Sequence, residues 1–536
     1  MIWRGSPRAD RAFDAPLTSF PPSSRLYCNR VSDEGVYSRM KILMIASEAE
    51  PFAKTGGLGD AVAALSRALS RAGHDVRVVL PRYSSIDRSK LEIVPGTIAV
   101  SIGSAVGGAE REERAKIYKS YLPGSAVEVY FLEHERYFCR EGLYGPKAAS
   151  DYPDNPERFA FFCRAAFELC RLLAWKPDVL HAHDWQASLA PVFLRYGELA
   201  ADFAGLKSVL SIHNLGYQGV YPKDCFTAFR LPWEAFHGAG FEFYDKVNLL
   251  KAGISSADGL TTVSPSYARE IQTPAGGFGL DGLLRCRSAD LVGILNGVDL
   301  DEWDPETDLR IPARYSSAKM AGKDKCKAAL QKEFGLPVSA DKPLIGMVGR
   351  FSDQKGVVEL FGTPGGSAYR ICADMDLQFA VIGSGDKWCE GEVRALSGRV
   401  PNFKARVGFD DKTAHLVEAG SDFFLMPSRY EPCGLNQMYS LRYGTLPIVH
   451  RTGGLADTVE NYNQDTGAGT GFTFDDLTPR SIYDTVGWAV WAWYNRREHI
   501  TAMRGRAMER RFSWDRSAAE YAKLYERAAA RRGAGR

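Results

Sequence analysis

Two short segments far apart in the chain each join a basic residue to paired glycines. Residues 54–60 read Lys-Thr-Gly-Gly-Leu-Gly-Asp, and residues 451–457 read Arg-Thr-Gly-Gly-Leu-Ala-Asp. Paired glycines let the backbone come close to a ligand, and a following helix N-terminus presents unpaired N–H groups to an anion. Two such loops suggest two nucleotide-binding halves with a phosphate-bearing donor between them.

The first of these loops carries the stronger prediction. Lys54 supplies a full positive charge, and the amides of Gly56 and Gly57 could bind a diphosphate while Asp60 faces a sugar or ribose. The alternative is a tight strand-to-helix turn without a ligand. A dinucleotide fingerprint fits poorly, because Val62 stands where the third glycine belongs, and the chain has no GxxxxGK[ST] loop.

The pattern around this loop predicts a βαβ unit and therefore a parallel sheet. An apolar run at 41–47 leads into the loop, helical spacing follows over 58–72, and a second apolar run spans 75–80. Further runs continue the first half, and a new series begins at 343. Their ranges are 127–132, 178–181, 208–212, 260–263 and 291–294, then 343–349, 377–382, 404–408, 422–426 and 446–449.

The restart divides the chain into two Rossmann-like domains, an α/β architecture. We expect an N-terminal domain at 40–295, a C-terminal domain at 296–512 and a final helix in 513–536 that returns to the first domain. Residues 1–39 lack periodicity and an apolar signal core. They are interpreted as a disordered tail, an organellar leader or a misassigned start before Met40.

The second half offers cations and a carboxylate at matching places. Arg350 ends its first strand and Lys355 lies in the following loop, which makes them the topological counterparts of Lys54. Glu431 lies in a Pro/Gly loop ahead of an expected helix at 436–443. It is a candidate ligand of the donor, and the alternative is that it caps that helix.

Metal-like patterns are weaker. His181 and His183 lie two apart on an expected strand and could share a ligand, but hydrogen bonding at the strand end is favoured because no Cys or Glu partners stand nearby. The triplets at 299–301 and 374–376 imitate the DxD of metal-dependent transferases. Such triplets are common in loops, so no metal is expected.

Composition limits the class of protein. The chain has 536 residues, 45% of them hydrophobic and 25% charged, and its formal net charge is only +2. This balance gives no support for a nucleic-acid or anionic-membrane binder. Ten cysteines occur without a CxxC pair, which fits a reducing compartment, and no run of 18 apolar residues is present.

Taken together, the motifs resemble those of the bacterial-type glycogen synthase and plant starch synthase family, in order from about Lys41 to the C-terminal helix. The segments that carry the resemblance are KTGGLGD (54–60), HAHDW (181–185), HNLGYQG (213–219), GILNGVD (293–299) and EPCGL (431–435). The family implies a GT-B glycosyltransferase that retains anomeric configuration. It moves glucose from ADP-glucose to the non-reducing end of an α-1,4-glucan, in the cytoplasm or, if 1–39 is a transit peptide, in a plastid.

The resemblance also assigns roles. Catalytic positions are implied for the backbone around His213, which faces the anomeric carbon, and for Arg350, Lys355 and Glu431. The remaining positions are implied to bind substrate, with no cofactor and no metal. They are Lys54, Gly56, Gly57, Asp60, Asn214, Asn248, Cys433, Gly434 and Leu435.

Two departures and three rivals stay open. Tyr439 stands where related retaining transferases often carry a second Glu for the ribose, and the glycine-rich segment 361–367 interrupts an expected helix. The rivals are a sucrose-type synthase using UDP-glucose, a Rossmann dehydrogenase and an inactive glucan-binding protein. Oligomeric state, chain length of the product and allostery are not indicated by the sequence.

Overall fold

The computed structural model describes residues 39–103, 110–146, 151–196 and 199–530, which belong to one compact unit. Apart from Arg39, the interpretations of the N-terminal segment concern residues outside these ranges. None of the described helices combines the length and the apolar character needed to cross a bilayer. The cysteines in the described ranges are all unpaired.

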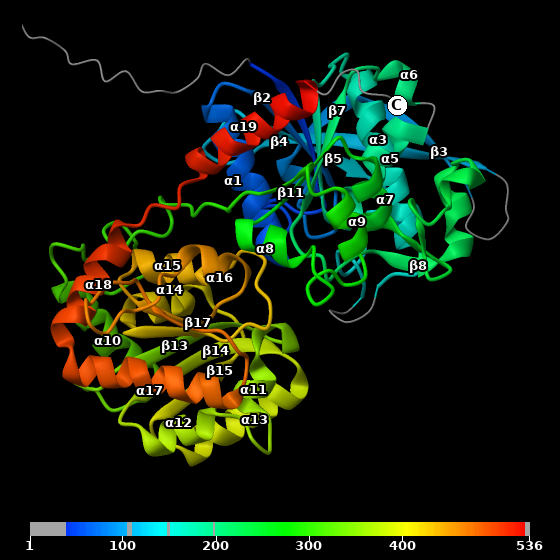
Figure 1. Cartoon of the computed structure of the whole chain (residues 1–536). Coiled ribbons are helices and arrows are strands. Elements are labelled where there is room, and N and C mark those ends of the chain that lie inside the picture. The colour runs from blue at the N-terminus through cyan, green and yellow to red at the C-terminus, as the bar shows by residue number, and fades with distance from the viewer. Residues whose placement is uncertain (1–38, 104–109, 147–150, 197–198, 531–536) are drawn as a thin grey trace, which may run out of the picture. The chain divides into compact units, whose positions relative to one another are not determined.

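The N-terminal half, drawn from blue to green in Figure 1, is built on a nine-stranded sheet. Its strand order is β12-β11-β7-β6-β1-β2-β5-β4-β3. All pairs are parallel except β3–β4 and β4–β5. The same half also contains a separate small sheet of order β8-β10-β9. The strands are β1 (Lys41–Ile45), β2 (Asp75–Pro81), β3 (Glu92–Ile102), β4 (Arg111–Tyr121), β5 (Glu128–Glu133), β6 (Val179–His183), β7 (Lys207–Ile212), β8 (Val220–Pro222), β9 (Glu242–Phe243), β10 (Lys246–Asn248), β11 (Gly259–Thr262) and β12 (Leu291–Gly293).

β1 lies between β2 and β6, so the strand order reverses at its carboxyl end. Ligands of open α/β sheets bind at such a switch point. The helices of this half are α1 (Gly57–Arg71), α2 (Glu135–Phe138), α3 (Asn155–Leu172), α4 (Asp184–Ala187), α5 (Leu189–Tyr196), α6 (Leu199–Asp202), α7 (Leu249–Ser256), α8 (Pro265–Glu270) and α9 (Asp281–Cys286), with 3₁₀ turns η1 (Arg88–Lys90), η2 (Lys223–Phe229) and η3 (Trp233–Ala235).

The C-terminal half contains an all-parallel six-stranded sheet of order β15-β14-β13-β16-β17-β18. Counted from its first strand this is 3-2-1-4-5-6, the order of a dinucleotide-binding Rossmann sheet. Its switch point lies at β13, the counterpart of β1. The strands are β13 (Leu344–Phe351), β14 (Gln378–Gly385), β15 (Phe403–Val407), β16 (Phe423–Met426), β17 (Leu446–His450) and β18 (Phe472–Phe474).

Both faces of this second sheet are buried, which explains its nearly continuous apolar runs. Along β16, Phe423 and Leu425 enter one core cluster while Phe424 and Met426 enter another. The covering helices are α10 (Ala321–Phe334), α11 (Val357–Phe361), α12 (Ala368–Asp374), α13 (Lys387–Arg399), α14 (Asp411–Gly420), α15 (Asn436–Arg442), α16 (Gly453–Thr458), α17 (Pro479–Asn495) and α18 (Arg497–Glu509), with one 3₁₀ turn, η4 (Asp353–Lys355).

The glycine-rich segment 361–367 divides what would be one helix into α11 and α12. The amide of Gly366 donates to Gly362 O at 2.7 Å and that of Ser367 to Glu359 O at 3.1 Å, so the chain turns back on the end of α11. The interruption is thus a compact turn whose backbone groups are satisfied locally.

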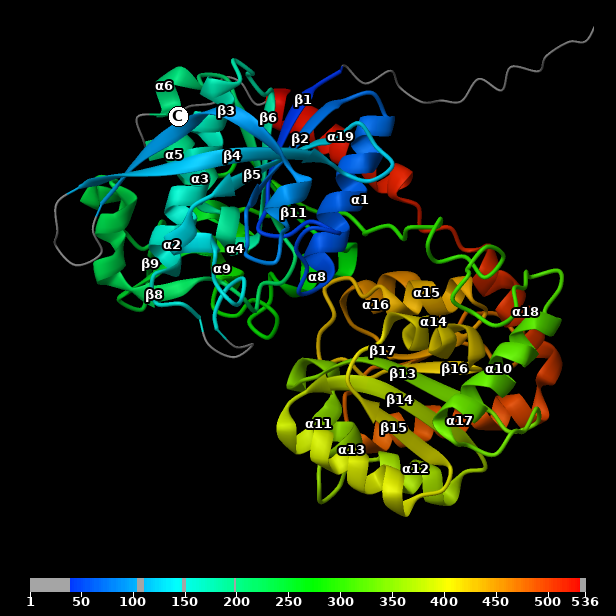
Figure 2. The same cartoon turned by 180° about the vertical axis from the view of Figure 1, so that it is seen from behind.

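The last helix, α19 (Trp514–Ala530), lies beside α1 of the N-terminal half in both views (Figures 1 and 2). The hydroxyl of Tyr525 is 2.9 Å from His181 Nδ1, and both side chains are buried. At the entry to α19 the chain runs next to the segment that leaves β12. Val298 N donates to Phe512 O at 2.7 Å, and Val298 bridges Ser513 in parallel.

Tyr525→Phe should destabilise the protein more than Asp515→Asn, although both remove one polar contact of α19. Losing the buried hydroxyl leaves His181 Nδ1 unsatisfied and should cost about 1–3 kcal/mol. Asp515 pairs with Arg71 at 2.8 Å on the surface, where such a pair contributes about 0–1 kcal/mol. Differential scanning calorimetry of the two variants tests this order. Equal shifts in Tm would contradict the buried role of Tyr525.

Candidate functional site

The Lys54 loop joins β1 to α1, at the switch point of the first sheet. Gly56 is the N-cap and Gly57 the first helical residue, so their amides stand at the helix N-terminus. Lys54 Nζ lies 2.7 Å from Asp60 Oδ1, and both side chains are partly exposed. Burial lowers the pKa of Lys54, but nearby carboxylates, chiefly that of Asp60, together raise it above its ordinary value, so the amine is cationic at neutral pH.

This loop is held from beneath by Glu48, a residue that motif reasoning missed. Its buried carboxylate accepts hydrogen bonds from Thr55 N at 2.6 Å and Thr55 Oγ1 at 2.7 Å, and also from the Tyr144 hydroxyl. Gly59 fits against the same turn, since a Cβ there would meet Ala53 O at 3.1 Å. The only sequence signal was a carboxylate six residues before Lys54.

The C-terminal half presents its cations at the matching place. Arg350 ends β13, is exposed, and has no ion pair with another described residue. Lys355 lies in η4 and its Nζ is 2.5 Å from Glu431 Oε2. The same oxygen accepts a hydrogen bond from Ser428 Oγ at 2.9 Å. Glu431 is 6% exposed, so its carboxylate is buried with a cation beside it.

The loop after Glu431 has a conformation that its glycine makes possible. Gly434 has φ +70°, and a Cβ there would lie 2.4 Å from Gln437 Oε1. Leu435 is the N-cap of α15, so Glu431 is not that cap. Cys433 is buried, and burial raises the pKa of its thiol to about 12. The Cys433 side chain is therefore a neutral thiol at pH 7 and not a thiolate.

His213 follows β7 and is partly buried. Its amide donates to Asp184 Oδ1 at 2.7 Å, and its Nε2 is 3.0 Å from His183 Nδ1. Burial lowers the pKa of His213 to about 4 and that of His183 well below its ordinary value, so both rings are neutral at pH 7. Burial also raises the pKa of Asp184 to about 7, while its bonds from backbone amides oppose the shift.

The two asparagines differ. Asn214 Oδ1 accepts from Gly216 N at 2.9 Å, and its side chain also meets the Tyr430 hydroxyl. Asn248 is buried as the N-cap of α7, with Oδ1 on Lys251 N and Nδ2 on Gln218. Its hydrogen-bonding groups are thus engaged within the protein, and its place near the glucose or ribose stays a prediction.

Close contacts join these groups from the two halves. A Cβ on Gly57 would meet Leu435 Cδ1 at 4.0 Å, and one on Gly216 would meet the Tyr430 hydroxyl at 2.8 Å. Ser264 Oγ donates to Pro432 O at 2.7 Å. The loop between β1 and α1 therefore lies near the loop that precedes α15.

The second glycine pair serves another purpose than expected. It follows β17, the fifth strand of its half by order, and not the first. Gly453 N donates to Glu270 Oε1 at 2.7 Å and Thr452 Oγ1 to Glu270 Oε2 at 3.1 Å. A carboxylate of the protein thus occupies the helix N-terminus, and the expectation of two equivalent phosphate loops is wrong for 451–457.

The histidines of β6 hydrogen-bond within the protein, as the favoured interpretation predicted. His181 Nε2 lies 2.7 Å from Ser211 Oγ, and its other nitrogen meets Tyr525. In the second DxD triplet, Asp374 accepts from the Tyr483 hydroxyl and Asp376 pairs with Lys342. Tyr439 is half-buried and stacks on Trp303 with ring centroids 3.8 Å apart.

Comparison with known proteins places these features in a family. Residues 41–286 match the family described as starch synthase catalytic domain, and residues 331–500 match glycosyl transferases group 1. The chain is 55% identical to glycogen synthase of Treponema denticola, over 91% of this chain and 98% of that one. The chain belongs to the glycogen synthase and starch synthase family.

Other glycogen and starch synthases agree. Glycogen synthase 1 of Geobacter sulfurreducens is 48% identical over 92% of this chain and 97% of its own. The catalytic domain of starch synthase IV from Arabidopsis thaliana, bound to ADP and acarbose, superposes with a TM-score of 0.81 at 31% identity, covering 92% of this chain and all of that one. A sucrose-phosphate synthase from Thermosynechococcus elongatus shares only the fold, at 17% identity and a TM-score of 0.56. The GT-B architecture expected for the family is confirmed.

His181→Gln should change the pH dependence of the free energy of unfolding of this glycogen synthase family member. Burial lowers the pKa of His181 to about 3, so the unfolded chain takes up the proton first as the pH falls through about 6.5. The histidine's contribution is therefore complete above that pH and is lost below it, by about 1.4 kcal/mol per pH unit. Between about pH 7 and pH 5 the wild type should lose about 2 kcal/mol relative to the variant. A constant difference, measured by urea unfolding, would contradict a neutral buried His181.

Proposed function

We propose that this protein transfers glucose from ADP-glucose to the 4-hydroxyl at the non-reducing end of an α-1,4-glucan, with retention of configuration. The observation that carries the proposal is the pairing of cations at equivalent switch points. Lys54 follows β1, the central strand of one sheet, and Arg350 lies at the end of β13 in the other sheet, with Lys355 in the turn after it. The names of the relatives, and the ADP in the starch synthase IV complex, favour this donor and acceptor.

These cations answer the main chemical demand of the reaction. The bond between glucose C1 and the diphosphate breaks, and negative charge gathers on the leaving oxygen. Each charge-assisted hydrogen bond to that oxygen or its phosphates contributes about 1.5–3 kcal/mol, and more where water is excluded. Lys54 with the amides of Gly56 and Gly57 would hold the diphosphate from one half, and Arg350 and Lys355 from the other.

The sugar would be held by the loop that begins α15. The amides from Cys433 to Leu435 and the carboxylate of Glu431 are assigned to the glucose hydroxyls, and the backbone around His213 to the face of the anomeric carbon. Because the His213 imidazole is neutral and bonded to His183, it serves as a fixed polar group and not as an acid. Asp60, Asn214 and Asn248 complete the assigned donor contacts.

The new bond is proposed to form on the face from which the diphosphate leaves. The acceptor hydroxyl oxygen bonds to C1 through an oxocarbenium-like state, and its proton passes to the leaving phosphate oxygen. Double displacement needs a carboxylate nucleophile beside C1. Glu431 is engaged by Lys355 and Ser428, which favours a binding role for it. The cytoplasmic location implied by the resemblance remains a prediction.

Two rival activities are weighed by the same features. A sucrose-type synthase would share the cation placement but use UDP-glucose and a small acceptor. A Rossmann dehydrogenase would need the third glycine that Val62 replaces, and Val62 is buried within α1. An inactive glucan-binding protein would not need the charged residues assigned to the donor, which are Lys54, Arg350, Lys355 and Glu431.

Lys54→Ala should lower kcat/KM for ADP-glucose by roughly 10²–10³, because one preorganised donor to the leaving group is lost. Lys332→Ala is the matched control, since it removes an exposed lysine of α10 that lies outside the assigned site. Initial rates with glycogen as acceptor give both values. Activity within about threefold of wild type in the Lys54 variant would count against the assignment.

Nucleotide release should be faster with ADP-glucose than with UDP-glucose, and it should require an α-glucan. We expect labelled glucose to enter glycogen and not to appear in sucrose when fructose is offered. Transfer to fructose from UDP-glucose would favour the sucrose-type rival. Turnover without any transfer to an acceptor would contradict both.

A further inference from the structure

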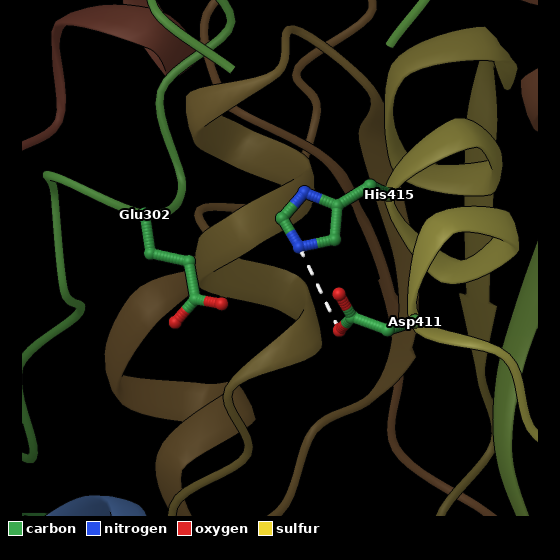
Figure 3. Close-up of side chains that lie close together, drawn as sticks. All are labelled: Glu302, Asp411 and His415. Atoms are coloured by element: carbon green, nitrogen blue, oxygen red, sulfur yellow. Dashed lines mark ion pairs between the residues drawn. The ribbon is translucent and has the colours of Figure 1, made fainter. Parts of the chain in front are cut away.

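Three ligand-type side chains gather at one place in the C-terminal half, apart from the groups assigned to the sugar transfer. Glu302, Asp411 and His415 each offer one ligand atom, and these atoms lie within 4.8 Å of one another. Asp411 and His415 are one turn apart on α14, while Glu302 precedes α10 (Figure 3). The carboxylates of Glu302 and Asp411 flank the imidazole nitrogen that faces Asp411 in that view.

His415 is fixed in one orientation. Its side chain is fully buried, and Nδ1 lies 2.8 Å from Asp308 Oδ2. Asp308 is itself held by the Tyr443 hydroxyl at 2.7 Å and by the amide of Arg310 at 2.8 Å. Because an ionised carboxylate only accepts hydrogen bonds, the proton of the neutral ring lies on Nδ1. The lone pair is therefore on Nε2.

That lone pair has no partner in the part of the chain that the structure describes. His415 Nε2 is buried without a hydrogen bond, and the nearest acidic oxygen, Asp411 Oδ1, is 3.9 Å away. A lone pair that faces a carboxylate is unfavourable, and a buried nitrogen without a hydrogen-bond partner is destabilising. A cation between the nitrogen and the carboxylates would remove both penalties.

Glu302 is held in reach of this nitrogen by its neighbour in sequence. Trp303 stacks on the His415 ring with centroids 3.7 Å apart, and on its other face it stacks on Tyr439. The backbone next to Glu302 is thereby packed against α14. The carboxylates of Glu302 and Asp411 are 43% and 54% exposed, so an ion could enter from solvent.

We propose that Glu302, Asp411 and His415 bind a divalent first-row transition ion of the Zn²⁺ class. An imidazole nitrogen with two carboxylates is a donor set that such ions take up readily, whereas Mg²⁺ prefers oxygen alone. The Asp308–His415 hydrogen bond is the outer contact that orients metal-binding histidines. The ion would pin the segment that carries Glu302 to α14, and the role is structural because none of the three belongs to the assigned site.

Arg310 competes for the same carboxylates. Its guanidinium pairs with Glu302 Oε1 at 3.0 Å and with Asp411 Oδ2 at 2.7 Å. One oxygen of each carboxylate is thus left for an ion, and the positive charge lowers the affinity of the site. The two kinds of variant should therefore change the metal affinity in opposite directions. Removing Arg310 should tighten binding, and removing a carboxylate should weaken it.

The test is Zn²⁺ binding to the purified full chain, measured by competition with a chromophoric chelator. We expect about one Zn²⁺ per chain at the site, with no displacement by millimolar Mg²⁺. Asp411→Asn and Glu302→Gln should each weaken it at least about tenfold, since even outer contacts of metal ligands are worth 10–100-fold. Glu306→Gln, an exposed acid four residues from Glu302, is the control and should leave binding unchanged.

Two further readouts separate this site from binding elsewhere. Arg310→Gln should tighten Zn²⁺ binding, and Zn²⁺ should raise the Tm of the wild type but not that of Asp411→Asn. Substituted Co²⁺ should show visible absorption bands without the intense thiolate band that cysteine ligands give. Affinity unaffected by the Asp411 and Glu302 changes, or a thiolate band, would overturn the proposal. So would an Arg310→Gln variant that binds Zn²⁺ no more tightly than the wild type, because the Arg310 guanidinium faces both carboxylates of the proposed site.

Discussion

A carboxylate as deeply buried as that of Glu431 needs a cation and hydrogen bonds around it, and this need organises the C-terminal half. Lys355 and Ser428 meet it within 3 Å. Lys355 follows β13 and Glu431 follows β16, so the pair can form only if those two strands are neighbours in the sheet. They are, and both end at the same edge. The strand order therefore places Lys355 beside Glu431, and this ion pair stabilises the proposed sugar-binding loop.

Most of the parallel strands were predictable because they are buried on both faces, whereas the three-residue parallel strand β18 was not predicted. Strands buried on both faces read as continuous apolar runs, and every run named from the sequence contains or overlaps a strand of the structure. The antiparallel pair β3–β4 was not predicted. Its outer face is exposed, so charged residues interrupt the apolar ones, as in β4, where buried Ala115 and Ile117 alternate with exposed Arg114 and Lys116.

The loops that follow β1 and β13 were also predictable, since glycines and cations there stand at strand ends. Their supports were not. Glu48 lies under Thr55 and belongs to no named motif. Asp184 belongs to HAHDW, but nothing in the spacing of that motif indicates that its carboxylate holds the amide of His213. The Gly453 loop misled for the same reason. Its local sequence resembles the Lys54 loop, but the partner, Glu270, is 183 residues away and known only from the fold.

The paired run of Val298 beside Phe512 and Ser513 has a consequence for how the chain holds together. The polypeptide passes from the first Rossmann sheet to the second and later returns, and the outgoing and returning segments lie side by side here. If a protease cut only one of these two segments, the other segment would still connect the two halves covalently. Release of a separate half would therefore need two cleavages, and the nicked protein would keep the docking of α19 on its first sheet.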